Sequence, residues 1–439
     1  MSKYWEKIAV IGAAGKMGKG ISLLLLQEMA CQDAERNSSV GKNGYRLVLV
    51  DQDEKTLFSL RQYFRPHLTR FAEKSINDLR SFFCDREDLI SNEQIINEFV
   101  KGALGIIRPS TSLDTVKHSS LVFEAIVEDV EAKINVLTQL NQICSSDTFY
   151  LTNTSSIPIT QLGKQSGLNG RLVGAHFYNP PPVQKLLEMI YPANVDPELK
   201  DLSLKIGKRL KKKVVASKDV AGFIGNGHFI REIAFACDLY DRLRKKHSHV
   251  DSVLMVDAIT RDFLIRPMGI FQLLDYVGLD VWKKIATVMG EAFPEENFSR
   301  PLLEEMIARK RIGGQEIDGS QRAGFFDYRK GKIIAVYNLE TDAYEELTEE
   351  KQKTIRELLG PFPERHRPWK EMVKVIDHEA EIECYEDELG ESSSPGAELA
   401  REHLTYSRKI AQKLVDDHVV SSMDDMKTVL KNGFYQVLV

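Results

Sequence analysis

A glycine-rich loop near the N-terminus constrains the fold more than any other feature of this sequence. Gly12, Gly15 and Gly18 separate a short apolar run at 7–11 from a longer apolar segment at 21–29. A short apolar run that ends at a turn is typical of a buried parallel strand, and the longer segment is typical of a helix. A strand, a glycine turn and a helix in this order predict the beginning of a doubly wound α/β sheet.

The three glycines have separate physical roles in such a loop. Gly12 permits a tight turn, Gly15 lets the backbone approach a pyrophosphate, and Gly18 lets the helix pack closely on the strand. Lys16 and Met17 then lie in the first turn of the helix, whose N–H groups can bind the anion. Flexible loops also need glycine, so the prediction of a dinucleotide site depends on the residues around the motif.

Asp51 supplies that context, because it ends a second apolar run at 46–50. A carboxylate at this place can accept hydrogen bonds from the ribose hydroxyls of adenosine and would repel a 2′-phosphate. We therefore expect NAD rather than NADP as the cofactor. Two departures from the usual motif need an explanation: the spacing is GxxGxxG, and Asp51 follows Gly12 by 39 residues. A polar insertion at 31–45 explains the second.

The pattern along the chain predicts three regions. Strands alternate with helices at first, which predicts a Rossmann-type, mostly parallel sheet domain over 1–217. A helical period then dominates, so we expect an all-helical domain over 218–330. Residues 331–439 are expected to form a mainly helical extension, with a hairpin at 332–347 and an exposed linker at 390–396.

The same patterns place individual elements. We expect strands at 120–125, 149–153 and 172–176, and helices at 56–79 (with Pro66 as a candidate break), 131–141, 223–246 and 250–263. A basic run at 208–213 is expected to be a solvated helix end rather than a binding patch.

Composition excludes several classes of protein. The 59 Lys and Arg residues against 64 Asp and Glu give a net charge of −5, without the basic excess of a nucleic-acid binder. Five cysteines without a CxxC pair argue against disulfides and a zinc ribbon, so we expect a reducing cytoplasm and no metal site. The most apolar stretch, 21–26, is too short to span a membrane, and Lys16 and Lys19 interrupt any signal peptide.

Four separated motifs then carry a family resemblance. His176 stands in Gly-Ala-His-Phe-Tyr-Asn-Pro, Glu188 follows it by 12 residues, Ser155 ends Asn-Thr-Ser, and Asn226 ends Gly-Phe-Ile-Gly-Asn. At this spacing the set resembles the L-3-hydroxyacyl-CoA dehydrogenase family, whose members oxidise the 3-hydroxyl of an acyl-CoA with NAD. The resemblance extends over residues 5–330.

The resemblance implies a role for each of these residues. His176 would be the base that takes the hydroxyl proton, which suits an imidazole because its ordinary pKa of ~6.5 lies near working pH. Glu188 would orient the imidazole and stabilise its charged form. Ser155 and Asn226 would hydrogen-bond the substrate oxygen or the histidine. Ser155 capping a turn and Asn226 capping a helix are the alternatives.

Further residues are assigned by the same resemblance. Glu128, Lys133 and Asn153 would bind the cofactor on its nicotinamide side, and Lys74 would contact the CoA phosphates. Glu128 and Lys133 as a solvated helix pair, and Lys74 as a solvated lysine, are the alternatives. The family's glycine-rich stretch at the end of its helical domain survives only in its second half, at 320–328.

The surplus beyond the resemblance resembles a segment of bacterial fused proteins in which an enoyl-CoA hydratase follows the dehydrogenase. Residues 400–434 are similar to a partial second copy of the helical domain. We expect NAD-dependent oxidation of L-3-hydroxyacyl-CoA by a homodimer, with a hydratase or thiolase as a further partner. A dehydrogenase of a hydroxy or sugar acid without CoA, and a non-catalytic NAD-binding subunit, remain alternatives.

Overall fold

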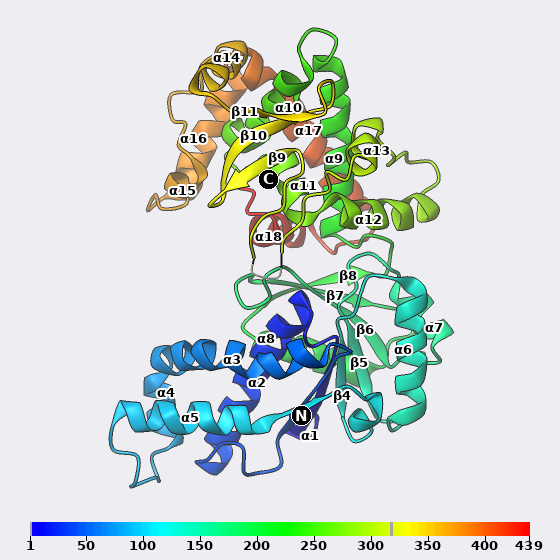
Figure 1. Ribbon diagram of the computed structural model, residues 1–439, viewed down its shortest axis with the longest axis vertical. Coiled ribbons are helices and arrows are strands. Elements are labelled where there is room, and N and C mark those ends of the chain that lie inside the picture. Colours follow the sequence, from blue (N-terminus) through cyan, green and yellow to red (C-terminus); the bar gives the residue numbers. More distant parts are fainter. Residues whose placement is uncertain (1, 317–318) are drawn as a thin grey trace. The chain divides into compact units, whose positions relative to one another are not determined.

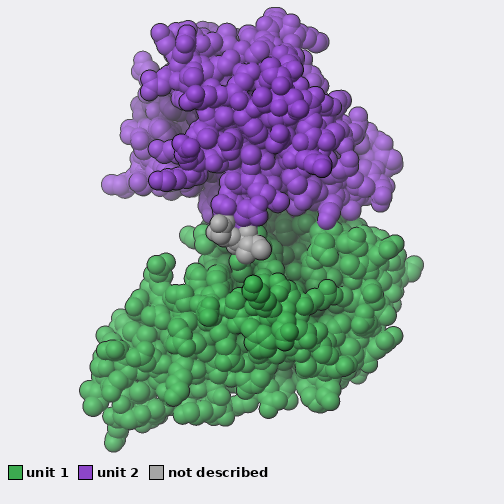
Figure 2. All heavy atoms as spheres, viewed as in Figure 1, with its two compact units in different colours: residues 1–220 green, residues 221–439 purple. Residues whose placement is uncertain are grey.

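The computed structural model describes residues 2–316 and 319–439, which divide into two units, Met1–Val220 and Ala221–Val439 (Figure 2). Each unit has its own apolar core. Among the described residues, no helix is long and apolar enough to cross a lipid bilayer.

Unit 1 is built on an eight-stranded sheet with the order β3-β2-β1-β4-β5-β6-β7-β8 (Figure 1). Every neighbouring pair is parallel except β6 and β7. The predicted doubly wound, mostly parallel sheet is therefore confirmed. The strands are β1 Lys7–Ile11, β2 Arg46–Val50, β3 Ile107–Ser110, β4 Leu121–Glu124, β5 Phe149–Thr152, β6 Leu172–Phe177, β7 Leu186–Tyr191 and β8 Lys213–Lys218.

Helices cover this sheet and connect its strands. They are α1 Ser2–Glu6, α2 Lys16–Asn37, α3 Glu54–Lys74, α4 Ile76–Phe82, α5 Asn92–Ile106, the 3₁₀ turn η1 Leu113–Val116, α6 Val130–Ile143, α7 Ile159–Gln165 and α8 Pro197–Arg209. Two sequence expectations are wrong here. Helix α2 continues through the first part of the expected insertion, because Gln32, Asp33 and Ala34 are buried. Pro66 lies inside α3, and the helix instead ends before Ser75.

The two faces of β6 have different environments. Val173, Ala175 and Phe177 belong to the apolar core that α2 and α8 also contribute to. Because side chains alternate along a strand, His176 faces the opposite side of the sheet. The sheet therefore separates His176 from the α2 and α8 layer.

Unit 2 is mainly helical. Its elements are α9 Gly225–Leu243, α10 His249–Ala258, the π-helical turn η2 Ile259–Phe263, α11 Ile270–Val277, α12 Leu279–Ala292, α13 Pro301–Ala308, β9 Phe326–Arg329, β10 Lys332–Asn338, β11 Ala343–Glu346, α14 Glu349–Leu359, α15 Trp369–Met372, α16 His378–Glu391, α17 Pro395–Asp416 and α18 Met423–Gly433. The expected hairpin is β10 and β11, and β9 adds a third antiparallel strand.

The expected extension shares its core with the helical domain. Helix α17 packs along α9 (Figure 1), and Ala400 and Leu404 of α17 lie in one apolar cluster with Ile230 and Ile233 of α9. The sequence places a boundary at residue 330, whereas the structure has no break in the core there. The C-terminal helices complete the surface of α9.

The segment predicted as an exposed linker is also packed. A Cβ added to Gly396 would lie 2.3 Å from Cζ of Phe263, so the backbone there touches an aromatic ring. Ser394 is 8% exposed, and its hydroxyl accepts a hydrogen bond from Ala397 N at the start of α17. The small residues that suggested a linker allow close packing and cap a helix instead.

A buried polar cluster also joins α9 to α17. The Glu232 carboxylate accepts a hydrogen bond from Arg266 at 2.7 Å, and it lies 3.7 Å from His403 Nδ1 and 4.0 Å from His228 Nδ1. Gln436 donates to the same carboxylate at 3.3 Å. Because a buried charge is costly without partners, these contacts fix the C-terminal residues against α9.

Candidate active site

The glycine loop between β1 and α2 has the geometry that its residues predict. Gly12 has φ of +76°, and a Cβ there would lie 2.6 Å from Ala125 O. A Cβ on Gly18 would lie 1.9 Å from Gly12 O, so only glycine allows α2 to approach the loop this closely. Gly15 is the N-cap of α2, and its peptide leads directly into Lys16.

Asp51 lies beside this loop in spite of its distance in sequence. Strand β2 pairs with β1 in the register Ile11 to Val50, so the ends of both strands meet. Asp51 Oδ2 accepts a hydrogen bond from Ala14 N at 2.9 Å, and Oδ1 accepts one from Asp53 N at 3.2 Å. The carboxylate thus stands at the glycine loop, where it can reach the ribose of a bound dinucleotide.

His176 and Glu188 are direct partners across two antiparallel strands. His176 on β6 is in register with Glu188 on β7, and His176 Nδ1 lies 3.8 Å from Glu188 Oε2. Both side chains are buried, at 10% and 0% exposure. The 12-residue spacing is therefore the length of a hairpin that folds one side chain over the other.

Tyr178 is a further member of this group that the sequence reasoning missed. Its hydroxyl donates a hydrogen bond to Glu188 Oε1, and its ring lies 4.8 Å from the His176 ring. Burial, together with the Glu188 charge, raises the pKa of Tyr178 well above its ordinary value, so the hydroxyl stays a donor. Its position two residues after His176 was the available signal, since alternate residues share a face.

Ser155 lies in a loop after β5 that closes around Glu128. Glu128 Oε1 accepts hydrogen bonds from Thr154 Oγ1 at 2.7 Å, from Ser155 N at 2.8 Å and from Ser155 Oγ at 3.0 Å. Burial acts to raise the pKa of Glu128, but the Lys133 ammonium and these hydrogen bonds outweigh it and the pKa is lowered. Glu128 and Ser155 are therefore held together, and Glu128 is kept ionised.

Lys133 is fully buried under this loop. Its Nζ donates to Glu124 Oε1 at 2.8 Å and to Oε2 at 3.1 Å, and it lies 3.6 Å from Glu128 Oε2. Burial lowers its pKa, but the two carboxylates raise it by more, so the ammonium persists. At 0% exposure, Lys133 is neither a solvated lysine nor placed to touch a cofactor; it holds Glu124 and Glu128 in position.

The other predicted residues have different surroundings. Asn153 Oδ1 accepts a hydrogen bond from Phe177 N at 2.8 Å, which ties the ends of β5 and β6 together next to His176. Lys74 is exposed at the last residue of α3. Asn226 is half-buried in the first turn of α9, in unit 2, whereas the rest of the predicted set lies in unit 1.

Family comparison decides what this arrangement is. The model of the 3-hydroxyacyl-CoA dehydrogenase NAD-binding domain matches residues 7–220, and the model of the C-terminal domain of the same enzymes matches residues 222–323. The chain belongs to the 3-hydroxyacyl-CoA dehydrogenase family. The two matches meet where unit 1 ends, and NAD is the cofactor of the first matched domain.

Relatives in this family cover most of the chain. The mitochondrial hydroxyacyl-coenzyme A dehydrogenase of Rattus norvegicus is 30% identical over 74% of this chain and 91% of its own length. The crystal structure of M. tuberculosis FadB2 is 25% identical, with a TM-score of 0.55 over 74% of this chain and 99% of that one. A 3-hydroxybutyryl-CoA dehydrogenase from Escherichia coli is 19% identical, with a TM-score of 0.62. That likeness covers 98% of this chain and 89% of the other, so the fold of the C-terminal residues recurs there.

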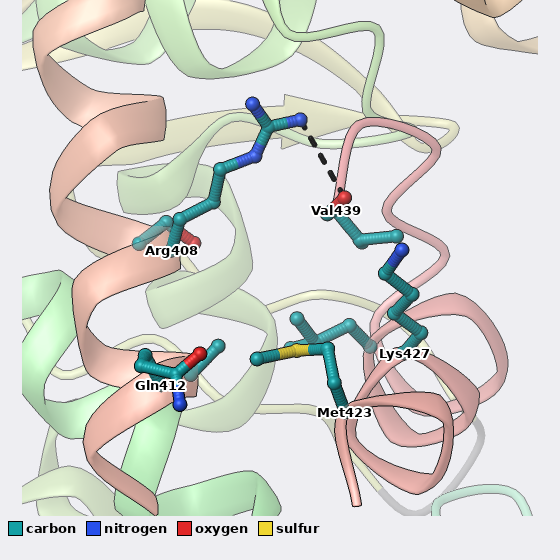
Figure 3. A pocket seen from close by; sticks show the side chains of 8 residues that line it. Arg408, Gln412, Met423, Lys427 and Val439 are labelled. Atoms are coloured by element: carbon teal, nitrogen blue, oxygen red, sulfur yellow. Dashed lines mark hydrogen bonds between the residues drawn. The ribbon is translucent and has the colours of Figure 1, made fainter. Parts of the chain in front are cut away.

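Two cavities lie apart from these residues. One of about 510 Å³ in unit 1 is lined by α2, α4, the loop between β6 and β7, and the turn between α8 and β8. Another of about 380 Å³ in unit 2 lies between α17 and α18, where Arg408, Gln412, Met423, Lys427 and Val439 surround it (Figure 3).

Proposed function

We propose that this chain catalyses the NAD-dependent oxidation of the 3-hydroxyl of an L-3-hydroxyacyl-CoA to a 3-ketoacyl-CoA. The observation that carries the proposal is the cross-strand pair of His176 and Glu188, 3.8 Å apart and buried next to the loop of Ser155. An imidazole with a carboxylate behind it is the arrangement that a proton-abstracting base needs. Membership of the family supports the same reaction.

In this proposal, His176 takes the proton from the 3-hydroxyl as the hydride leaves C3. Glu188 stabilises the imidazolium that forms, and the Tyr178 hydroxyl keeps the Glu188 carboxylate in place. Ser155, whose hydroxyl donates to Glu128, accepts from or donates to the substrate oxygen, and Asn226 contacts it from unit 2. Bound NAD supplies the hydride acceptor.

The cofactor residues divide between its two ends. At the adenosine end we propose Asp51 for the ribose hydroxyls and the loop of Gly12, Gly15 and Gly18 for the pyrophosphate, together with the first-turn N–H groups of Lys16 and Met17. At the nicotinamide end we propose Glu128, with Lys133 and Asn153 acting by fixing the strand ends around it. Lys74 is proposed for the CoA phosphates because it is exposed.

An activity assay tests the proposal. We expect NADH oxidation with acetoacetyl-CoA, followed at 340 nm, and loss of at least ~10³ of kcat in His176→Ala, because the base is then absent. Equal rates with free acetoacetate would instead favour an enzyme that does not need CoA. Absence of turnover in the wild type, or full turnover in His176→Ala, would overturn the assignment.

Assembly and compartment are proposals as well. We propose a homodimer and a reducing, cytoplasmic location, the latter supported by five cysteines that all stand as free thiols. Light scattering of the purified chain measures its mass, and imaging of the tagged chain reports its compartment. Co-purification from cells tests a hydratase or thiolase partner.

A further inference from the structure

The loop that joins the two strands of the His176 and Glu188 pair is held from several sides. This loop spans residues 178–185, between the end of β6 and the start of β7. Tyr178, at its first position, donates to Glu188. Pro181, near its middle, packs on α2, because a Cβ on Gly20 would lie 2.8 Å from Pro181 Cδ.

Lys212 is the third attachment of this loop. It lies in the turn between α8 and β8, and its Nζ donates to Pro181 O at 2.5 Å and to Gln184 O at 2.6 Å. The next residue, Lys213, donates its backbone N–H to Lys185 O at 2.8 Å as β8 begins to pair with β7. The basic run at 208–213 is therefore not simply a solvated helix end, because one of its lysines is bound to the loop.

We propose that Lys212 is a positioning residue for the reaction: by binding both carbonyls of the 178–185 loop it fixes His176 and Glu188 relative to each other. This inference rests on the proposed function, because it concerns the geometry of the same pair. The ammonium has three hydrogens, and two of them are directed to carbonyls three residues apart. Losing this double contact would free the hairpin that sets the distance between base and carboxylate.

The charge of Lys212 is sensitive to pH near the working range. Burial lowers its pKa to about 8, because its printed hydrogen bonds go to neutral carbonyls. The cavity beside it is also lined by the titratable groups Glu28, Cys31 and Glu35 of α2, Asp78 of α4, Lys185 of the loop, and Arg209 and Lys211 of its own turn.

The buried carboxylate among these groups is engaged elsewhere. Glu28 Oε1 accepts from Gln32 Nε2 at 2.7 Å and lies 3.4 Å from Arg209 Nη1, and burial raises the pKa of Glu28. Above its pKa, Lys212 would lose one hydrogen and its attraction to the carbonyl dipoles. Loosening of the loop, and a fall in kcat, should therefore follow on the alkaline side of pH 8.

Three variants test this proposal. Lys212→Met removes the ammonium at nearly equal length, Lys212→Arg keeps two donors and stays charged, and Lys208→Met is the matched control on the exposed part of the same basic run. We expect Lys212→Met to lose ten- to a hundredfold of kcat for acetoacetyl-CoA reduction, the cost of about 1 Å of misplacement, with an unchanged Kd for NADH. Lys208→Met should retain wild-type values.

The pH profile separates positioning from mere packing. We expect kcat of the wild type to fall above pH 8 and kcat of Lys212→Arg to stay level there, because arginine keeps its proton. A wild-type alkaline fall in Lys212→Arg, or kcat of Lys212→Met within twofold of Lys208→Met, would overturn the proposal. If Lys212→Met does not fold, Lys212→Arg decides by its profile.

Hydrogen exchange of the 178–185 loop keeps this test distinct from that of the reaction itself. Faster exchange there in Lys212→Met than in Lys208→Met supports the attachment, and equal exchange contradicts it. This measurement needs no turnover. A wild type without activity but with a Lys212-dependent loop would therefore remove the proposed function and leave the attachment standing.

Discussion

Replacing the Glu188 carboxylate by an amide tests the central electrostatic argument. Glu188→Gln keeps the shape of the side chain and an oxygen that can still accept the Tyr178 hydroxyl, but it removes the negative charge. The carboxylate is fully buried 3.8 Å from the His176 ring nitrogen, so little solvent screens the pair. The variant should therefore fold normally and fail in the chemical step.

The size of the effect follows from the distance. Unit charges 3.8 Å apart attract by roughly 4 kcal/mol at an effective dielectric constant of about 20. Since about 1.4 kcal/mol is a factor of ten in rate, losing this stabilisation of the imidazolium costs up to ~10³ in kcat. The amide dipole restores part of it, so we expect a loss of ~10² to 10³.

Steady-state kinetics of acetoacetyl-CoA reduction measures this loss, with NADH binding followed separately by fluorescence. We expect the Kd for NADH to stay unchanged, because Glu188 lies away from the glycine loop. Glu131→Gln, on the exposed side of α6, is the matched control and should have wild-type kcat. A Glu188→Gln enzyme with kcat within threefold of the control would refute the idea that this carboxylate stabilises a charged histidine.

Three further predictions concern other parts of the molecule. Gly18→Ala should raise the Kd for NADH at least ~10-fold by fluorescence titration, because its Cβ would lie 1.9 Å from Gly12 O and must displace the pyrophosphate loop. Asp51→Ser should weaken NADH binding and narrow the preference over NADPH, since the charge that repels a 2′-phosphate is gone; an unchanged preference would contradict this role. Burial lowers the pKa of His403 to about 4, so the unfolded chain takes up the proton first as pH falls below ~6.5. The free energy of unfolding should therefore drop by about 2 kcal/mol between pH 7.5 and pH 5 in urea titrations, and His403→Phe should remove that part of the slope.

Local patterns in the sequence predict the beginning of the fold well. The apolar run, the glycines and the run ending at Asp51 become β1, the loop and β2, because a buried parallel strand and a tight turn each need particular residues locally. The short edge strand β3 escapes prediction, since Arg108 and Pro109 interrupt any apolar run there. Strand β7 is missed because its buried Glu188 breaks the apolar pattern.

The site is predictable where it depends on spacing and unpredictable where it depends on burial. The 12 residues between His176 and Glu188 indicate a pair, and the structure places them in register. Lys133 is indistinguishable in sequence from a surface lysine, because its burial comes from Glu124 on another element. Lys212 is hidden in the same way, since its carbonyl partners are backbone atoms that no residue type reveals.

The shared core of unit 2 has a consequence for how this chain can be shortened. The family match ends at residue 323, but Ala400 and Leu404 of α17 and the partners of Glu232 lie beyond it. A chain cut there would leave one side of α9 unsheltered and a carboxylate with fewer counter-groups. Sequence homology and mechanical independence thus have different limits in this protein: the recognisable enzyme stops a hundred residues before the piece that can fold.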